Sequence, residues 1–245
     1  MKNKNFRELL YTMLSIIILL IFWKVVSLII DKEILVPSPE KTFIEIINII
    51  QSAYFIPSLV NTLKRALVGF IMAVGIGIFL GMMGGLFKPI YYLLRPIVLV
   101  NKAVPTMAMI LLALIWLESE KAPVLVGFVV IFPIIYENVV QGIRNVDVKL
   151  IEMMKIYDVS RWDMIKELYI PSMRTYLYGA MTAAMGLNLK IIIAAEVLSQ
   201  PRISMGTSFQ IEKVNLNTAG VFAWSLITIV LAGVLEQTLR IMRRN

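Results

Sequence analysis

The chemistry open to this chain is limited, because its 245 residues include no Cys and no His. A thiolate nucleophile, a disulfide bond and any metal site or proton relay built on imidazole are therefore excluded. Carboxylates and carbonyls remain as possible metal ligands, but the acidic residues form no cluster that would suit a metal. Asp residues are confined to polar segments, so no pair of Asp side chains lies within an apolar run. We expect neither a metal site nor an enzyme.

Charged and amide side chains that interrupt long apolar runs are the remaining candidates. Lys190 lies well inside one run, and Glu196 lies near the end of the same run. Six residues turn a helix by about 600°, so Lys190 and Glu196 do not share a face and do not pair within that helix. Lys190 either attracts an anionic solute, forms a structural ion pair elsewhere or snorkels to an interface. Candidates for lining a solute path or a gate are Asn101, Lys102, Glu137, Asn138, Asn188, Lys190 and Glu196.

The apolar runs that carry these residues are long enough to cross a membrane. The chain is 59% hydrophobic with a mean hydropathy of +0.81, whereas soluble domains are nearer to about 45–50% apolar. A spanning helix needs about 20 mostly apolar residues. We therefore expect an all-α integral membrane protein with six transmembrane helices, at Tyr11–Ile30, Ala66–Phe87, Ile97–Leu117, Ala122–Val140, Tyr176–Leu198 and Gly220–Leu239.

Membrane topology explains the net charge of +8 better than a nucleic-acid partner does. With the N-terminus placed in the cytoplasm, 14 Lys and Arg residues fall in inside segments and 7 in outside segments, and such residues concentrate on the cytoplasmic side. The first apolar run continues into Asp31–Glu33 without a small-residue cleavage site, which indicates an uncleaved helix. We expect a multi-pass protein of the inner (plasma) membrane with both termini in the cytoplasm.

Two further patterns predict how the helices pack. On the outer side, the run Glu40–Ile50 follows the chain break at Pro37–Pro39 and has the spacing of a short amphipathic helix at the membrane interface. In the second span, small residues recur every four positions and would let another helix approach closely. The helix that packs on this stripe could belong to the same chain or to a second copy in a dimer, and the sequence does not decide between them. The stripe consists of Gly69, Ala73, Gly77, Gly81 and Gly85.

The segment Asp147–Pro171, between the fourth and fifth spans, is too regularly patterned to be a plain linker. It holds nine charged residues, and its apolar residues recur at helical spacing. Asp158 marks a turn, after which Ser160 and Asp163 form a capping-box arrangement. We expect a cytoplasmic helix, a turn and a second short helix that Pro171 stops.

Aromatic residues favour contact between this segment and a partner protein. Trp162 and Tyr169 lie on the second short helix among basic residues, and aromatic side chains on a protruding helix are typical of binding hot spots. A solvated connector is the alternative interpretation.

The spacing of this segment resembles the EAA loop of ABC importer permeases, whose pattern is E-A-A-x3-G-x9-I-x-L-P. Two positions match outright, two are conservative replacements, two methionines stand for alanines, and Asp158 stands for the glycine. Asp is among the few residues that tolerate the positive φ of a glycine turn. The resemblance implies that the helix around Arg161–Tyr169 couples to an ATPase, through Glu152, Met153, Met154, Asp158, Arg161, Trp162, Leu168, Ile170 and Pro171.

Residues 60–240 as a whole are similar to the same family, in the branch that carries nitrate, sulfonates, taurine, bicarbonate or vitamin precursors. The segments with this similarity are Asn61–Arg65, Val104–Thr106, Leu114–Trp116, Ala194–Glu196 and Met205–Gly206. The resemblance implies an N-terminal helix with an outer amphipathic segment over residues 1–60 and a permease core over 61–245. It also implies two permease copies in a homodimer, an ATP-binding cassette subunit and an extracytoplasmic solute-binding protein.

ATP chemistry is expected on the partner and not in this chain. The phosphate-binding pattern G-x-x-x-x-G-K-[ST] does not occur, and the dipeptide Gly-Lys is absent. We therefore expect no cofactor here, with ATP and Mg²⁺ on the partner subunit. The alternative function is a secondary transporter or channel that works without an ATPase, with Glu137 and Glu196 as ion-coupling carboxylates.

Overall fold

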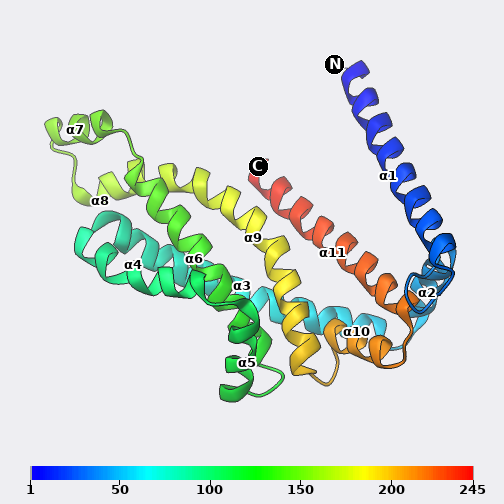
Figure 1. Cartoon of the computed structure of the whole chain (residues 1–245). Helices are drawn as coiled ribbons and strands as arrows, with labels where there is room; N and C mark the ends of the chain where they lie inside the picture. Colours follow the sequence, from blue (N-terminus) through cyan, green and yellow to red (C-terminus); the bar gives the residue numbers. More distant parts are fainter. Residues whose placement is uncertain (1, 245) are drawn as a thin grey trace.

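The computed structural model describes residues 2–244, with the side chains of residues 10–239 and 241, and every regular element among them is helical (Figure 1). This confirms the expected all-α fold. The elements are α1 (Lys2–Ile30), α2 (Pro39–Gln51), α3 (Phe55–Leu86), α4 (Lys88–Ala103), α5 (Thr106–Trp116), α6 (Ala122–Arg144), α7 (Val148–Ile156), α8 (Arg161–Met164), the π-helical turn η1 (Ile165–Tyr169), α9 (Ile170–Ser199), α10 (Met205–Val214) and α11 (Thr218–Arg244).

The number of membrane spans agrees with the sequence, but one of them is broken. Five helices are long and apolar enough to cross a membrane, and the pair α4 and α5 makes a sixth crossing if it counts as one span. The expectation of one helix over Ile97–Leu117 is wrong, because α4 and α5 are bent by 101° relative to each other. Pro105 explains the break, since it lacks a backbone N–H and holds Val104 in an extended conformation (φ −71°, ψ 127°).

The helix after the α7–α8 region is longer than the sequence pattern indicates. α8, η1 and α9 follow one another without a break, so Arg161–Ser199 forms one helical rod of 39 residues. The expectation that Pro171 stops a short helix is therefore wrong. In the π-helical turn the Ile170 N–H donates to the Ile165 carbonyl, and Pro171 directly follows this turn, whose irregular hydrogen bonding lets the helix continue through the proline.

Small residues on α3 set its distance from α6 in the core. A Cβ atom added at Gly77 would lie 2.8 Å from Ile135 Cγ2, and one at Gly81 would lie 2.7 Å from Val139 Cβ. One at Gly75 would meet nothing within 4 Å. The stripe of small residues is thus filled by α6 of the same chain, which is the intramolecular packing that the sequence left open.

The expected outer helix over Glu40–Ile50 is present as α2. Ile46 and Ile49 pack into an apolar cluster with residues of α9 and α11. Phe43 and Ile47, on the other face, are about half exposed. The amphipathic pattern of the sequence is therefore reproduced in the fold.

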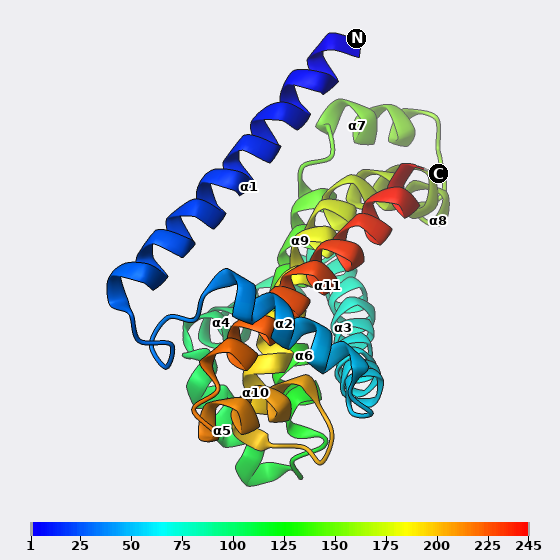
Figure 2. The same cartoon turned by 90° about the vertical axis from the view of Figure 1, so that its right-hand side faces the viewer.

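The two ends of the molecule are built differently. α7 and α8 lie at one end, with the N-terminal end of α1 and the C-terminal end of α11, whereas α5 and α10 lie at the opposite end (Figures 1 and 2). α1 stands apart from the core helices (Figure 2). It is attached near its C-terminal end, where Trp23 stacks on Phe222 with ring centroids 5.6 Å apart and the Lys24 ammonium bonds the Glu40 carboxylate at 2.7 Å.

Candidate functional site

Helix α7 ends in a turn built around Asp158. This residue has a φ of 51°. Its N–H donates to the Lys155 carbonyl at 3.1 Å, and the Val159 N–H donates to the Met154 carbonyl at 3.0 Å. These two bonds make a Schellman motif, in which a residue with positive φ closes the helix. The expectation that Asp158 adopts the conformation of a turn glycine is confirmed.

Ser160 starts the second helix of this loop. Its Oγ accepts a hydrogen bond from the Asp163 N–H at 3.1 Å and donates one to Asp163 Oδ2 at 2.6 Å. The cap that the sequence predicts is therefore present. We refer to residues 147–164, which contain α7, the turn and α8, as the α7–α8 loop.

The α7–α8 loop presents large apolar side chains that are mostly exposed among the residues that the structure describes. Ile156 is 79% exposed, Tyr157 77% and Trp162 72%. Tyr169, expected beside Trp162 on the contact surface, instead packs against the core cluster of α3, α6 and α9. The sequence pattern does not mark Ile156 as a contact residue. It shows only that an apolar residue stands at the last position of a helix.

The other residues assigned to this loop divide between surface and interior. Most of the residues expected to face a partner are exposed. Leu168 and Ile170 point toward the interior, because they belong to the long helix that enters the core. The exposed ones are Glu152, Met153, Arg161 and Pro171, the partly buried ones are Met154 and Ile170, and the buried one is Leu168.

Two of the residues expected to line a solute path, Lys102 and Glu137, lie opposite each other on α4 and α6. The Lys102 ammonium lies 2.9 Å from Glu137 Oε2, beside a cavity of about 350 Å³ between the two helices. Asn101 is partly buried on α4. Asn138 does not join this group through its side chain, because its amide donates to the Ile134 carbonyl of its own helix at 2.8 Å.

The two polar candidates in the middle of α9 have different surroundings. Asn188 is fully buried and donates to the Ala66 carbonyl at 2.8 Å, so it fastens α9 to α3. Lys190 is exposed and forms no ion pair among the side chains that the structure describes. One turn earlier, Gly186 lies against the Glu236 carboxylate of α11.

Glu196 is fully buried and is surrounded by donors. Its Oε2 accepts from the Thr62 hydroxyl at 2.8 Å and from the Gly206 N–H at 3.2 Å, and its Oε1 accepts from the Arg65 guanidinium at 2.8 Å. A Cβ atom at Gly206 would lie 2.6 Å from the Val197 backbone nitrogen, so only glycine permits this approach. We call Thr62, Arg65, Glu196 and Gly206 the Glu196 clasp.

The Glu196 clasp extends to the turn between α5 and α6. Arg65 also pairs with the Glu120 carboxylate, which accepts a hydrogen bond from the Arg202 N–H at 2.9 Å. Burial alone would raise the pKa of Glu120, but the Arg202 N–H and the Arg65 guanidinium outweigh it and hold the pKa below its ordinary value. The clasp therefore joins α3, the α5–α6 turn, α9 and α10 at the end of the molecule opposite the α7–α8 loop.

Three segments that the sequence presents as separate motifs meet in this clasp. Asn61–Arg65, Ala194–Glu196 and Met205–Gly206 each supply a member. Sequence reasoning named Glu196 and missed Arg65 as its partner. The available signal was an arginine at the start of one span and a carboxylate at the end of another.

A family model described as binding-protein-dependent transport system inner membrane component matches residues 73–244. This range includes the α7–α8 loop, the whole 39-residue rod and α11. The match therefore covers most of the chain and all of the candidate coupling residues.

Curated relatives with the same kind of name match most of the chain at modest identity. The taurine transport system permease protein TauC of Escherichia coli is 23% identical over 94% of this chain and 85% of that protein. The riboflavin transport system permease protein RibX of Chloroflexus aurantiacus is 27% identical over 92% of this chain and 87% of that protein. The nitrate import permease protein NrtB of Leptolyngbya laminosa is 31% identical over 56% of this chain and 50% of that protein.

A solved structure with a similar fold is the MetNI methionine ABC transporter in an inward-facing conformation. The similarity has a TM-score of 0.68 at 13% identity and covers 78% of this chain and 95% of that chain. At this identity the likeness concerns the fold alone, and it agrees with the helical arrangement described above.

Proposed function

Because this chain belongs to the family of binding-protein-dependent transport system inner membrane components, we propose that an ATP-binding partner drives it through the α7–α8 loop. The chain is the transmembrane permease subunit of an ATP-driven solute importer and is not itself an enzyme. The observation that carries the coupling proposal is the exposed apolar surface of Ile156, Tyr157 and Trp162. This surface lies next to a rod of 39 residues that runs to the opposite end of the molecule, so a push on the loop reaches the membrane core.

We propose that the α7–α8 loop and both termini face the cytoplasm. The loop and the terminal ends of α1 and α11 lie at the same end of the molecule (Figure 2). Basic residues favour the cytoplasmic side, and those of this end include Lys149, Lys155, Arg161 and Lys166. The terminal basic residues that support the same orientation have side chains outside the described residues; these are Lys2, Lys4, Arg7, Arg240, Arg243 and Arg244.

The proposed assembly contains two copies of this chain, with ATP and Mg²⁺ held by the ATP-binding subunits. Lys190 is exposed on a single copy, and Lys102 and Glu137 are partly so. Charges exposed to lipid are costly, and a second copy facing this surface would enclose them around a solute path. An extracytoplasmic binding protein would then deliver the solute at the end that holds α5 and α10.

Reconstitution in proteoliposomes tests the proposed function. Uptake should require this permease, the ATP-binding subunit, the binding protein and ATP with Mg²⁺ together, because the chain has no phosphate-binding loop of its own. Leaving out the ATP-binding subunit should abolish uphill uptake. Uptake against a gradient by the permease alone would instead support a secondary transporter.

We further propose that Lys190 faces the solute path and attracts an anionic solute. Taurine and nitrate are the solutes in the names of two relatives, and each carries an anionic group. Replacing Lys190 with Met should raise the KM for such a solute about tenfold, because a hydrogen bond between charged groups is lost. The measurement is ATP-driven uptake at a series of solute concentrations.

The matched control for this prediction is Lys121→Met. Lys121 is exposed and, among the described side chains, forms an ion pair only with the exposed Glu118, a contact of small energetic value. It should leave uptake unchanged. Equal KM values in the Lys190 and Lys121 variants would show that Lys190 does not act on the solute.

A further inference from the structure

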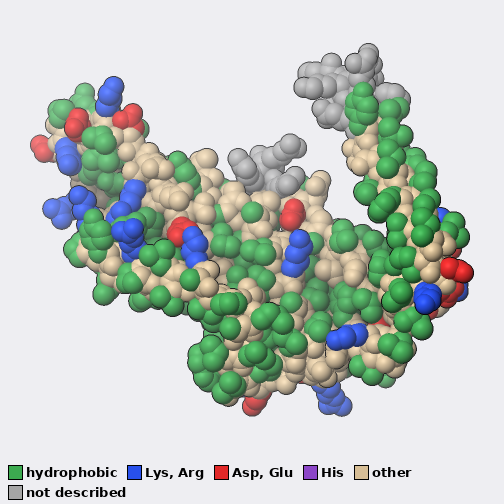
Figure 3. Space-filling model, in the orientation of Figure 1, with side chains coloured by type: hydrophobic (Ala, Val, Ile, Leu, Met, Phe, Trp, Pro, Cys, Tyr) green, Lys and Arg blue, Asp and Glu red, His purple; other side chains and the backbone are tan. Residues whose placement is uncertain are grey.

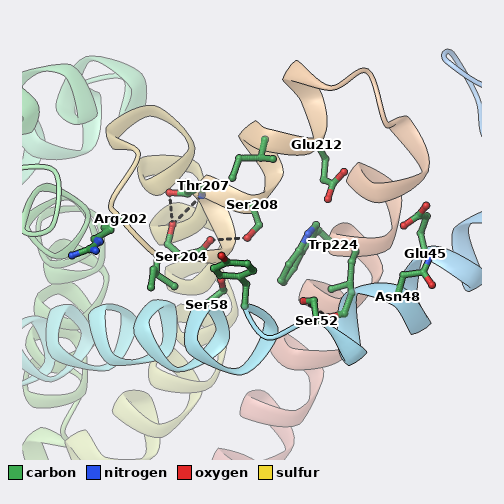
Figure 4. A pocket seen from close by; sticks show the side chains of 14 residues that line it. Glu45, Asn48, Ser52, Ser58, Arg202, Ser204, Thr207, Ser208, Glu212 and Trp224 are labelled. Atoms are coloured by element: carbon green, nitrogen blue, oxygen red, sulfur yellow. Dashed lines mark hydrogen bonds between the residues drawn. The ribbon is translucent and has the colours of Figure 1, made fainter.

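A cavity of about 510 Å³ lies at the end of the molecule opposite the α7–α8 loop. Its walls come from α2, from the first turn of α3, from α10 and from the start of α11 (Figure 4). α3 and α11 are spans that begin here, so the cavity lies where the chain leaves the hydrocarbon and meets the headgroup layer. Tyr54, in its wall, is 71% exposed and is a residue type that favours this layer.

Two carboxylates face this cavity on the side away from Arg202, the cationic residue that also lines it. Glu45 extends from α2 and Glu212 from α10 toward the same space (Figure 4). Neither forms an ion pair among the described side chains. The Glu212 carboxylate accepts a hydrogen bond from the side-chain amide of Asn217 at 2.8 Å. Partial burial raises the pKa of Glu212, and the nearby charge of Glu45 raises it further, against the effect of Asn217.

Aromatic and hydroxyl groups complete the cavity wall. Trp224 is 3% exposed and lies between the carboxylates and the serine side of the cavity (Figure 4). The face of an indole attracts a cation. Ser58 is 2% exposed and lines the cavity, and its hydroxyl makes no hydrogen bond with any other described residue. A hydroxyl in a cavity wall can donate a hydrogen bond to a polar occupant and accept one from it.

We propose that this cavity binds a primary ammonium group, held between Glu45 and Glu212 beside the indole of Trp224, with the polar remainder of the ligand reaching toward Ser58. An ammonium offers three N–H donors, which suits two carboxylates that otherwise repel each other. The group can come from an ethanolamine phospholipid headgroup in the adjoining leaflet or from a small free amine. This site is separate from the α7–α8 loop and from the Lys190 region, and it does not depend on which solute is carried.

Lipid and amine titrations of the purified, delipidated importer complex test the site. Native mass spectrometry would follow the binding of phosphatidylethanolamine, of phosphatidylcholine, whose quaternary ammonium has no N–H donor, and of phosphatidylglycerol. Calorimetry with ethanolamine would test the free amine. Phosphatidylethanolamine should bind at least about tenfold more tightly than the other two lipids, because each lost hydrogen bond between charged groups has about this effect.

The double variant Glu45→Gln with Glu212→Gln should remove this preference. Its matched control is Glu33→Gln with Glu118→Gln, two exposed acids that pair with Lys41 and Lys121 and do not line the cavity. The control should keep the preference.

Each outcome of these titrations decides the proposal. Loss of phosphatidylethanolamine binding in the double variant supports a lipid ligand, and loss of ethanolamine binding supports a free amine. Equal binding of the three lipids with no ethanolamine binding overturns the site, as does an unchanged preference in the double variant. If only docking of the binding protein fails in the double variant, the cavity receives a protein side chain and the amine proposal is wrong.

Discussion

Replacing Arg65 with Met should lower the free energy of unfolding of this permease by about 3–5 kcal/mol, the range typical of breaking a buried ion pair from one side. Glu196 is fully buried, and Arg65 is the only cation paired with it among the described side chains. Without Arg65 the carboxylate keeps only the Thr62 hydroxyl and the Gly206 N–H. The measurement is thermal or denaturant unfolding of the purified protein in detergent.

Two further variants distinguish the cost of leaving the Glu196 charge unpaired from the cost of losing the packing of the Arg65 side chain. The double variant Arg65→Met with Glu196→Gln should be more stable than Arg65→Met alone, because a neutral amide does not leave a buried charge unpaired. Glu120→Gln should change stability by less than about 1 kcal/mol, since Glu120 is half exposed. A double variant less stable than Arg65→Met would contradict this account of the Glu196 clasp.

Replacing Trp162 with Ala should weaken binding of the ATP-binding subunit by about 2 kcal/mol or more, which is roughly thirtyfold in affinity. Trp162 is 72% exposed on α8 in the isolated chain, and an exposed tryptophan that becomes buried in a complex is a frequent hot spot. ATP-driven uptake should fall in parallel. Co-purification from detergent and uptake in proteoliposomes measure the two effects.

Trp116→Ala is the matched control for this prediction. Trp116 is 65% exposed, and it lies on α5 at the opposite end of the molecule (Figure 1). It should leave binding of the ATP-binding subunit unchanged. If both variants co-purify with that subunit equally well, the α7–α8 loop is not its docking surface.

The elements of this fold could largely be predicted because they follow from one-dimensional patterns. Apolar run length predicts the spans, and the turn at Asp158 follows from the few residues that tolerate positive φ. The break between α4 and α5 could not be placed from hydropathy, because both halves are apolar and only Pro105 marks the bend. The continuity of α8, η1 and α9 was missed because a π-helical turn shifts the position at which a proline is tolerated.

The contacts of the site depend on three-dimensional pairing and were less predictable. The sequence indicates Lys102 and Glu137 as separate candidates. Their ion pair could not be predicted, because it depends on α4 and α6 lying opposite each other in the fold. The partner of Glu196 lies 131 residues away, and no local pattern connects the two. On the surface, basic side chains gather near α7 and α8 (Figure 3).

The unbroken helix from Arg161 to Ser199 has a thermodynamic consequence. At about 1.5 Å per residue its 39 residues extend nearly 60 Å along the helix axis, and they connect the α7–α8 loop, where we propose that the ATP-binding subunit docks, to the Glu196 clasp. Coupling free energies are reciprocal. If solute delivery moves the end of this helix at the Glu196 clasp, the same coupling free energy changes the affinity of the α7–α8 loop for the ATP-binding subunit, so that solute binding regulates ATP hydrolysis.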